Sequence, residues 1–532
     1  TPLSVAVVLD VAAPPALRPD GTVVLADSAV ARARQRADIL RDLPGLPITM
    51  APLPETLAAL PLAGQQGQEA ADELRAAALT HPVLARPFVD VDLAALRQAG
   101  LIGEANAQAE GGASIVRSHL GTEPIGGIWL SGPTLGAESA RLARDLTFTR
   151  ALLPPSALAG DDDGPAPLAP VQLADGGPLA LVDDPDLAAH LTGDAGALGG
   201  HRFIAELAIT WLEAPVNPRA VVVRLPADAD LDPGTVTSAL AALGDGQAVQ
   251  ALPLDQVFDT VSPADDGAPT VELAPHDGPD LRDVAGPLRA ARASVNGLGG
   301  LVDDPILAAS LHQSLLLSTG TDTPGAERTA HVDRVNDALG SVTGAVALPD
   351  EFRITLTSRA SSIPVTLDNL SDRELSVRVE LDSDQLEFPE GTVVPASLPP
   401  GTTRLEVPVR ARTSGAFTLL VRVTSPDGSI ELDRSTFDIR STAISGVGLA
   451  LSIGAGLFLL VWWGRHWRNS RRSQHLMPTG TPSPPAQPFP AGAGDRTPPP
   501  AASRDPAGTG PDVSYRPAHM AAGGRPGTAR RV

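Results

Sequence analysis

The chain has 532 residues, with 40 basic and 62 acidic side chains, a formal net charge of −22 and no cysteine. All 40 basic residues are arginines. Chemistry that needs a lysine or a thiol is therefore excluded, including P-loop nucleotide hydrolysis, Schiff-base formation, cysteine nucleophiles and disulfide bonds. A chain of this length has room for two or three domains.

The first 258 residues alternate short apolar runs with amphipathic stretches. The apolar runs are 5–9, 47–51, 83–88, 127–130, 147–153, 179–182, 220–225 and 248–252, and the helix-like stretches are 28–43, 92–100, 135–145, 204–212 and 233–243. This order predicts a mainly parallel sheet, either a barrel of the (β/α)7–8 type or an open doubly wound sheet. We favour an α/β, barrel-like βα domain over residues 1–258.

The sequence changes character after residue 258. Residues 259–285 are rich in Pro, Asp and Gly and predict a linker. Residues 286–345 predict a helical subdomain with helices near 288–298, 306–317 and 326–339. Residues 346–440 alternate apolar and polar side chains in about seven short runs separated by turns, which predicts an Ig-like β-sandwich.

Residues 441–464 contain no ionisable side chain and are long enough to cross a hydrocarbon core of roughly 30 Å, so they predict one transmembrane helix. Aromatic and basic residues follow at once and predict a membrane interface: Trp462, Trp463, Arg465, Trp467, Arg468, Arg471 and Arg472. The remainder of 465–532 is basic and rich in Pro and Gly, which predicts a disordered cytoplasmic tail.

Charge is divided unequally along the chain. Residues 464–532 carry 10 Arg and 3 acids, or +7, so residues 1–463 carry 30 Arg and 59 acids, or −29. The positive side is expected to face the cytoplasm and anionic membrane lipid, with the acidic domains outside the plasma membrane. This topology requires export, so we expect a removed signal peptide before Thr1. The acidic domains exclude nucleic acid as a partner.

Candidate chemistry lies where the predicted parallel strands end. Catalytic groups of βα barrels come from the carboxyl ends of strands, and the acids there are Asp10, Asp90, Asp92, Asp183 and Asp184. Two such carboxylates could perform glycosidic acid/base chemistry, although Asp also commonly caps helices. Glu206 lies in an apolar helical run, where burial would raise its pKa, although such a residue more often lies at the edge of the buried face. No metal site or cofactor is expected, because the seven histidines before residue 441 lack metal-ligand spacing.

One short stretch occurs twice. Residues 181–191 read LVDDPDLAAHL and residues 301–311 read LVDDPILAASL. Asp184 and Asp304 are expected to be N-caps, with Pro185 and Pro305 at the first helical position. A cation site built by the paired carboxylates is the alternative.

The order of these segments resembles an uncharacterised family of actinobacterial single-span membrane proteins that are often encoded beside the lipid II flippase. The matching phrases are 47–52, 86–92, 203–208, 354–358 and 363–365. Phe88 and Val91 stand where the family usually has Tyr and Pro, and Leu130 to Gly132 follow Trp129 where it has a proline and an acid. The resemblance implies an envelope protein that assists the handling of peptidoglycan precursors.

Two functions are carried forward. The first is a non-enzymatic, single-span cell-envelope protein that scaffolds or assists the peptidoglycan-precursor and cell-wall machinery, with membrane lipid and cell-wall synthesis proteins as partners. The alternative is a polysaccharide-active barrel hydrolase, or a degenerate descendant of one, on the outer face of the membrane. Asp10, Asp90 and Asp92 are its candidate catalytic residues, and their convergence in one cleft would favour it.

Overall fold

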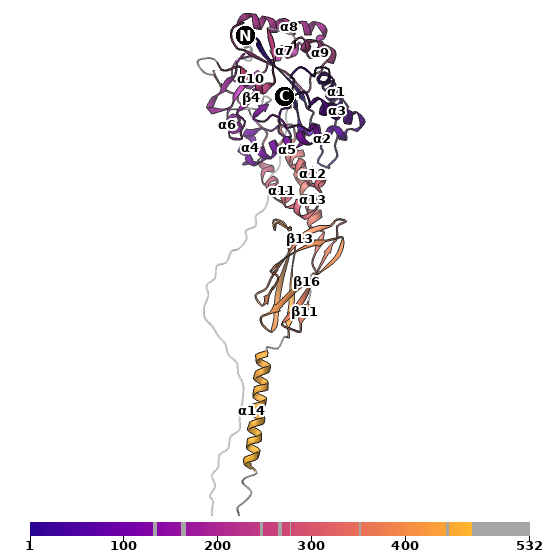
Figure 1. Cartoon of the computed structure of the whole chain (residues 1–532), viewed down its shortest axis with the longest axis vertical. Helices are drawn as coiled ribbons and strands as arrows, with labels where there is room; N and C mark the ends of the chain where they lie inside the picture. The colour runs from indigo at the N-terminus through magenta and orange to yellow at the C-terminus, as the bar shows by residue number, and fades with distance from the viewer. Residues whose placement is uncertain are drawn as a thin grey trace, which may run out of the picture. The chain divides into compact units, whose positions relative to one another are not determined.

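The computed structural model describes residues 1–130, 136–160, 166–244, 248–263, 269–276, 278–349, 353–442 and 446–470. The chain divides into two compact units, Thr1–Ala450 and Leu451–Val532. The first unit is a mixed α/β structure, in which helices surround the sheets of its N-terminal part (Figure 1).

Parallel strands form the centre of the N-terminal region. Strand β1 (Leu3–Val11) pairs in parallel with β2 (Thr49–Pro52), β7 (Ala220–Leu225) and β8 (Val249–Ala251). A second sheet pairs β3 (Ile128–Leu130), β4 (Arg150–Leu153) and β6 (Leu179–Val182) in parallel, and β5 (Val171–Leu173) joins it antiparallel. These sheets form a half-barrel, and the predicted mainly parallel sheet is confirmed.

Single bridges extend this pairing beyond the two sheets. Met50 bridges to Val83, Leu84 bridges to Ile125, and Asp183 at the end of β6 bridges to Val222 of β7. The predicted run 83–88 is therefore reduced to two bridging residues. Pro82 and Pro87 bound this short segment, and proline has no N–H to donate to a ladder.

Helices cover the parallel strands. Helices occur at the five predicted amphipathic stretches and after the predicted cap Asp184, while α2, α3, α5 and α10 were not predicted. Their bounds are α1 (Asp27–Asp42), α2 (Pro54–Ala59), α3 (Gly64–Ala77), α4 (Leu93–Gln98), α5 (Ile102–Leu120), α6 (Ala137–Asp145), α7 (Pro185–Ala189), α8 (Gly196–Glu213), α9 (Pro233–Ala241) and α10 (Leu254–Thr260).

The segment expected to be a linker, 259–285, contributes ordered structure. It contains the end of α10, strand β9 (Thr270–Val271), which pairs in parallel with β5, and the first turn of α11 (Arg282–Leu301). Leu273 and Leu281 within it are buried. These two side chains hold the described residues around them against the buried cluster, although the Pro, Asp and Gly content alone suggested a linker or loop.

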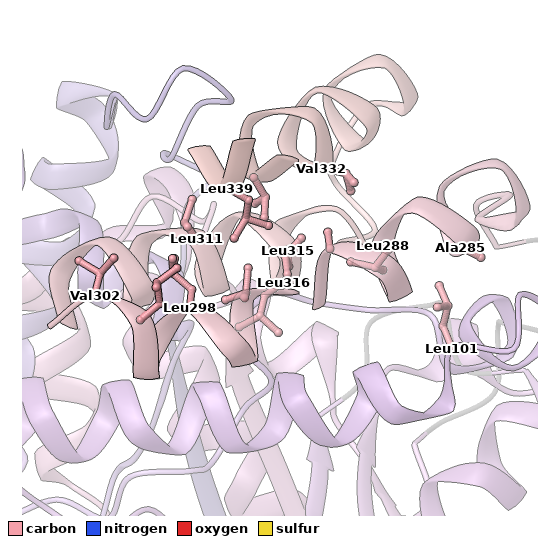
Figure 2. Packing of buried hydrophobic residues seen from close by; sticks show 14 of the residues in the cluster. Leu101, Ala285, Leu288, Leu298, Val302, Leu311, Leu315, Leu316, Val332 and Leu339 are labelled. Atoms are coloured by element: carbon pink, nitrogen blue, oxygen red, sulfur yellow. The ribbon is translucent and has the colours of Figure 1, made fainter. Parts of the chain in front are cut away.

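Three helices follow: α11, α12 (Pro305–Leu317) and α13 (Gly325–Thr343). Figure 2 shows their leucines and valines directed at one another and at α5. Leu288, Leu298, Leu315 and Val332 are at most 2% exposed. Along each helix the buried apolar residues recur every three or four positions, in α11 at 284, 288, 291, 295 and 298, which places them on one face and explains the observed packing.

The C-terminal part of the first unit consists of two sheets. One has the order β10-β12-β16-β14 and the other β11-β18-β17-β13-β15. All pairs are antiparallel except β11 with β18, and alternate side chains of both sheets enter one buried cluster. The strands are β10 (Val346–Ala347), β11 (Arg353–Leu356), β12 (Ala360–Asn369), β13 (Leu375–Asp382), β14 (Leu386–Glu387), β15 (Val393–Leu398), β16 (Gly401–Ala411), β17 (Gly415–Thr424) and β18 (Glu431–Ser441).

Helix α14 (Gly446–Ser470) overlaps most of the predicted transmembrane segment. The described residues include no helix with both the length and the apolarity needed to cross a membrane. Residues 443–445 of the predicted segment, the side chains of 446–449, and the tail from 471 onward lie outside the described structure. Arg471 and Arg472 of the predicted interface are among them.

Candidate functional site

The carboxyl ends of β1, β6 and β7 bring three charged side chains together. Val8 of β1 is in register with Arg224 of β7. Since side chains alternate along a strand, Asp10 lies on the same face as Val8 and therefore on that of Arg224. Asp183, directly after β6, bridges to Val222 of β7. We call Asp10, Asp183 and Arg224 the rim cluster.

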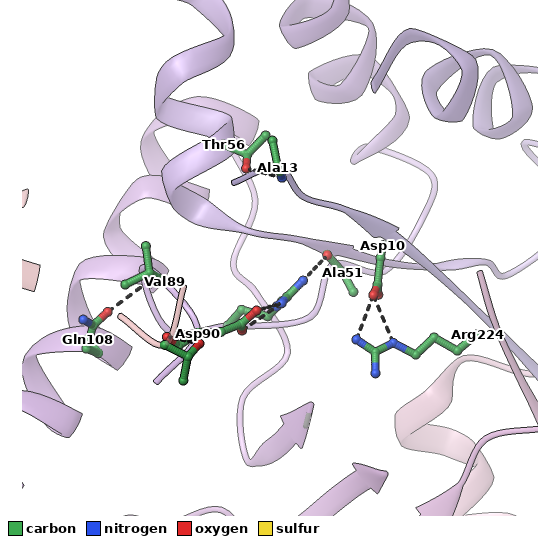
Figure 3. A network of polar contacts seen from close by, with 10 residues as sticks. Asp10, Ala13, Ala51, Thr56, Val89, Asp90, Gln108 and Arg224 are labelled. Atoms are coloured by element: carbon green, nitrogen blue, oxygen red, sulfur yellow. Dashed lines mark hydrogen bonds and ion pairs between the residues drawn. The ribbon is translucent and has the colours of Figure 1, made fainter. Parts of the chain in front are cut away.

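Asp10 is held in a buried ion pair. Its Oδ2 accepts hydrogen bonds from Arg224 Nε at 3.0 Å and Nη2 at 2.8 Å (Figure 3). Asp10 is 4% exposed, and its Oδ1 is buried with no hydrogen-bond partner among the described residues. One oxygen of the Asp10 carboxylate is thus bound by two nitrogens of Arg224.

Arg36 fixes the backbone around the ion pair. This arginine of α1 is 1% exposed and donates to the carbonyl oxygens of Asp10 at 2.7 Å and of Pro226 at 2.7 Å. Burial lowers the pKa of Arg36 to about 10, so it remains charged at neutral pH. The guanidinium therefore ties the end of β1 to the residue that follows β7.

Asp90 is engaged by a second buried arginine. Arg86 is 4% exposed, and its Nη2 donates to both carboxylate oxygens of Asp90 at 2.8 Å. Arg86 Nη1 also donates to the carbonyl oxygen of Ala51 in β2 at 3.1 Å. The Asp90 carboxylate, 44% exposed, is thereby fixed by an arginine that is anchored to the sheet.

Asp92 caps helix α4 and contacts a histidine. Its Oδ1 accepts the N–H of Ala95 at 2.8 Å, which caps α4, and its Oδ2 lies 3.2 Å from His276 Nε2. Asp92 is 1% exposed. Asp10, Asp90 and Asp92 thus each have different partners: Arg224 for Asp10, Arg86 for Asp90, and the start of α4 with His276 for Asp92.

Asp183 is the acid of the rim cluster whose proton affinity is most altered. It is 6% exposed, and burial, with the charges of Asp10 and Asp184, raises its pKa to about 7 against the opposing effect of Arg224. Asp183 and Arg224 line an open cleft of about 420 Å³ together with Ser156 and Thr192. Asp183 can therefore exchange a proton with a group in this cleft near neutral pH.

Sequence reasoning found the acids of this site and missed its arginines. Arg224 is the one charged residue in the strand AVVVRL, and Arg86 precedes the acids 90 and 92 by only a few positions. A charge inside a buried parallel strand needs a partner. That signal could have predicted an ion pair at the strand ends.

The other candidates occupy separate positions. Glu206 Oε2 lies 2.7 Å from His190 Nε2 on the domain surface. Asp184 and Asp304 both cap helices, as predicted. Within the described residues no group of three or more His, Asp or Glu is arranged to hold a metal ion. The predicted interface residues Trp462, Trp463 and Trp467 of α14 are exposed. The Trp462 ring stacks on the His466 ring, with 5.6 Å between the ring centroids.

The fold and the site define a mixed α/β protein with a half-barrel, a three-helix segment and two antiparallel sheets, whose strand ends carry paired Arg and Asp side chains. A family model matches residues 23–492, and the chain belongs to that family, described as a family of unknown function (DUF6049). No curated protein matches the chain.

Solved structures give distant likenesses. One is the α-amylase AmyC from Thermotoga maritima, with TM-score 0.41 and 10% identity over 64% of this chain and 92% of that one. An α-mannosidase from Enterococcus faecalis has TM-score 0.44 and 8% identity over 81% and 61% of the two chains. A polysaccharide deacetylase from Mycobacterium smegmatis has TM-score 0.34 and 15% identity over 52% and 95%. At these values the likenesses identify no function for the chain.

Proposed function

We propose that this chain is a non-enzymatic cell-envelope protein, anchored in the plasma membrane near its C-terminus, that scaffolds or assists the machinery handling peptidoglycan precursors. The observation that supports a non-enzymatic role is that two of the strand-end acids are already bound by arginines. Asp10 and Asp90 are each bound by a buried arginine. Hydrolysis of a glycosidic bond uses two carboxyl groups that are free to act on the substrate.

The anchored location is supported by helix α14. Its side chains described from Leu451 to Trp467 include large apolar groups such as Phe458, 70% exposed, and Trp463, 70% exposed. Exposed apolar side chains in such a continuous series are typical of a surface covered by lipid or protein. The arginines after residue 464 favour the cytoplasmic side for the tail.

The finer fold assignment belongs to the same proposal. We infer that the half-barrel closes as a barrel of the (β/α)7–8 type, because single bridges join β2 to 83–84, residue 84 to 125, and β6 to β7. We also infer an Ig-like arrangement for the two C-terminal sheets, because their alternating side chains share one core. An experimental structure in which the segments at 83–84, 125 and 128–130 are not neighbours would contradict the barrel assignment.

Topology can be tested because the chain has no cysteine. Ser28→Cys and Ser483→Cys variants of the full chain would be labelled in intact cells with a membrane-impermeant maleimide. In intact cells we expect the Ser28→Cys variant to be labelled and the Ser483→Cys variant not to be labelled. The Ser483→Cys variant should be labelled after the cells are permeabilised. Labelling of 483 in intact cells would overturn the proposed orientation.

The scaffolding role is tested by crosslinking the tagged full chain in cells and identifying the proteins recovered after mild detergent extraction. We expect membrane proteins of cell-wall synthesis to be enriched over a control bait with the same anchor and tail but without residues 1–440. Equal recovery with both baits would contradict a scaffolding role for the external domains.

A polysaccharide hydrolase is the second candidate, and Asp183 is the observation that favours it. Its carboxyl group lines an open cleft and titrates near neutral pH, as a general acid should. The full chain would be assayed for release of reducing ends from peptidoglycan, beside Asp183→Asn and the control Asp303→Asn. Activity that is lost only in Asp183→Asn would overturn the non-enzymatic proposal.

A further inference from the structure

Asp183 directs a buried carboxyl group at the strand-end cleft. The residue is 6% exposed and lines the cleft of about 420 Å³. Among the described residues no side chain or backbone N–H donates a hydrogen bond to this carboxyl group. A buried carboxylate without a hydrogen-bond donor is costly, so a carboxyl group in this position takes either a proton or a ligand that donates to it.

The backbone fixes the place from which this side chain enters the cleft. The Asp183 N–H donates to the carbonyl oxygen of Leu153 in β4 at 2.9 Å, and the Asp184 N–H donates to that of Val222 in β7 at 2.8 Å. Asp184 also caps α7 through its Oδ1. Residues 183 and 184 are therefore held by two strands and a helix before any ligand binds, which lowers the entropy cost of binding.

Acidic groups outnumber basic ones around Asp183. The charges that act on its carboxyl group are those of Arg224 on β7, Asp10 on β1 and Asp184 before α7. Arg224 donates to Asp10 through Nε at 3.0 Å and Nη2 at 2.8 Å, so these two opposite charges balance each other (Figure 3). Asp183 and Asp184 then add two acids without a second guanidinium. The cleft therefore favours a cation over an anion.

The rest of the lining indicates what kind of cation fits. Ser156 and Thr192 supply hydroxyl groups, and the apolar members are Pro154, Pro185, Ala188, Ala189, Pro226 and Ala229. A metal ion takes several oxygen or nitrogen ligands, and the described residues hold no group of three or more His, Asp or Glu arranged for one. An ammonium group has three N–H donors, and the carbon atoms attached to it can contact the proline and alanine side chains.

We propose that this cleft binds a small organic ammonium ligand whose charged nitrogen donates to the Asp183 carboxylate, with the hydroxyl oxygens of Ser156 and Thr192 as further acceptors. The cleft volume is at the lower end of the range for small-molecule sites, so the ligand is a primary amine with a short apolar body. This binding role is independent of the membrane anchoring and scaffolding proposed above.

Binding of the ammonium group should release a proton. Burial and the neighbouring acids raise the pKa of Asp183 to about 7, so about half of the carboxyl groups are protonated at neutral pH. The ammonium group binds the ionised form. The ionised fraction rises from about one tenth at pH 6 to about nine tenths at pH 8, while an alkylamine stays charged, so affinity should rise about tenfold over this range.

Calorimetric titration of the detergent-purified full chain with pentylamine tests the proposal, and pentanol is the matched uncharged control. We expect pentylamine to bind about tenfold more tightly at pH 8 than at pH 6, and pentanol to bind at least tenfold more weakly than pentylamine at pH 8. Absence of pentylamine binding, equal binding of pentanol, or displacement of pentylamine by an equal concentration of Mg²⁺ would overturn the proposal.

A pair of variants assigns the binding to Asp183. Asp183→Asn should weaken pentylamine binding at pH 8 at least tenfold and remove the pH dependence between pH 6 and 8. Asp303→Asn changes the exposed equivalent in the repeated stretch and should leave both unchanged. Circular dichroism verifies that both variants are folded. Unchanged affinity or a retained pH dependence in folded Asp183→Asn would contradict the assignment of the ammonium site to this carboxyl group.

Discussion

The two copies of the LVDDP stretch adopt the same local structure in different surroundings. Asp184 caps α7 by accepting the Leu187 N–H at 3.0 Å, and Asp304 caps α12 by accepting the Leu307 N–H at 2.9 Å. In both, a proline occupies the first helical position. Local sequence thus determines the cap and the start of the helix in the same way twice.

The acids nevertheless differ in charge behaviour. Asp183 is 6% exposed beside Arg224 and Asp10, while its counterpart Asp303 is exposed. Burial raises the pKa of Asp184, whereas the hydrogen bond from Leu307 and the nearby Arg373 lower the pKa of Asp304. The comparison teaches that five identical residues specify a helix start, and that distant parts of the chain decide which carboxyl group can take part in chemistry.

The largest difference in stability between the two copies of the stretch is expected when the neighbouring arginine is replaced, Arg224 near the first copy and Arg373 near the second. Arg224→Gln should destabilise the protein by about 3–5 kcal/mol, because it leaves Asp10 charged and buried without its partner. Arg373→Gln removes the partner of Asp304, which can turn to water, so its effect should be too small to resolve. Denaturant unfolding at pH 7 measures both, and similar losses in the two variants would contradict the assigned environments.

The second difference concerns the first Asp of each copy. The pKa of Asp183 is raised from an ordinary value of 3.8 to about 7, so the folded protein binds a proton that the unfolded chain releases in this range. Stability should therefore fall as pH rises from about 4 to 7, by on the order of 4 kcal/mol.

Asp183→Asn removes this loss. It should stabilise the protein at pH 8 and have little effect at pH 4, while Asp303→Asn should change stability at neither pH. Unfolding curves at the two pH values provide the measurement. A gain that is equal at pH 4 and pH 8 would mean that Asp183 does not titrate in this range.

These contrasts show which parts of the structure were accessible to sequence reasoning. The parallel strands, the three helices after residue 281 and the alternation in β13 follow from local apolar spacing, which a single segment contains. The described residues of the segment 259–285, expected to be a linker or long loop, are mostly irregular, but the sequence did not predict that Leu273 and Leu281 within it are buried against residues distant in the chain.

The site was predictable only in part for the same reason. Asp10 and Asp183 were found, since carboxyl ends of parallel strands meet at one edge. Their state depends on Arg224, which lies more than 200 positions from Asp10 and reaches it only through the register of β1 and β7. No local pattern contains that register, so the sequence predicted several candidate acids at the strand ends but not the ion pair between Asp10 and Arg224.

The smallest expected difference concerns the two caps. Asp184→Ala should cost about 1 kcal/mol, as is usual for a lost N-cap. Asp304→Ala should lower the melting temperature more at pH 7, because the folded state favours the charged form of Asp304 and disfavours that of Asp184. The stability that charged Asp304 contributes is lost as the pH falls through its lowered pKa. The destabilisation caused by charged Asp184 is also lost at acidic pH. The difference in melting temperature between the two Ala variants should therefore be smaller at acidic pH. Asp184→Asn and Asp304→Asn keep the capping oxygen and serve as matched controls. If Asp184→Ala lowered the melting temperature more than Asp304→Ala at pH 7, the opposite pKa shifts assigned to Asp184 and Asp304 would be contradicted.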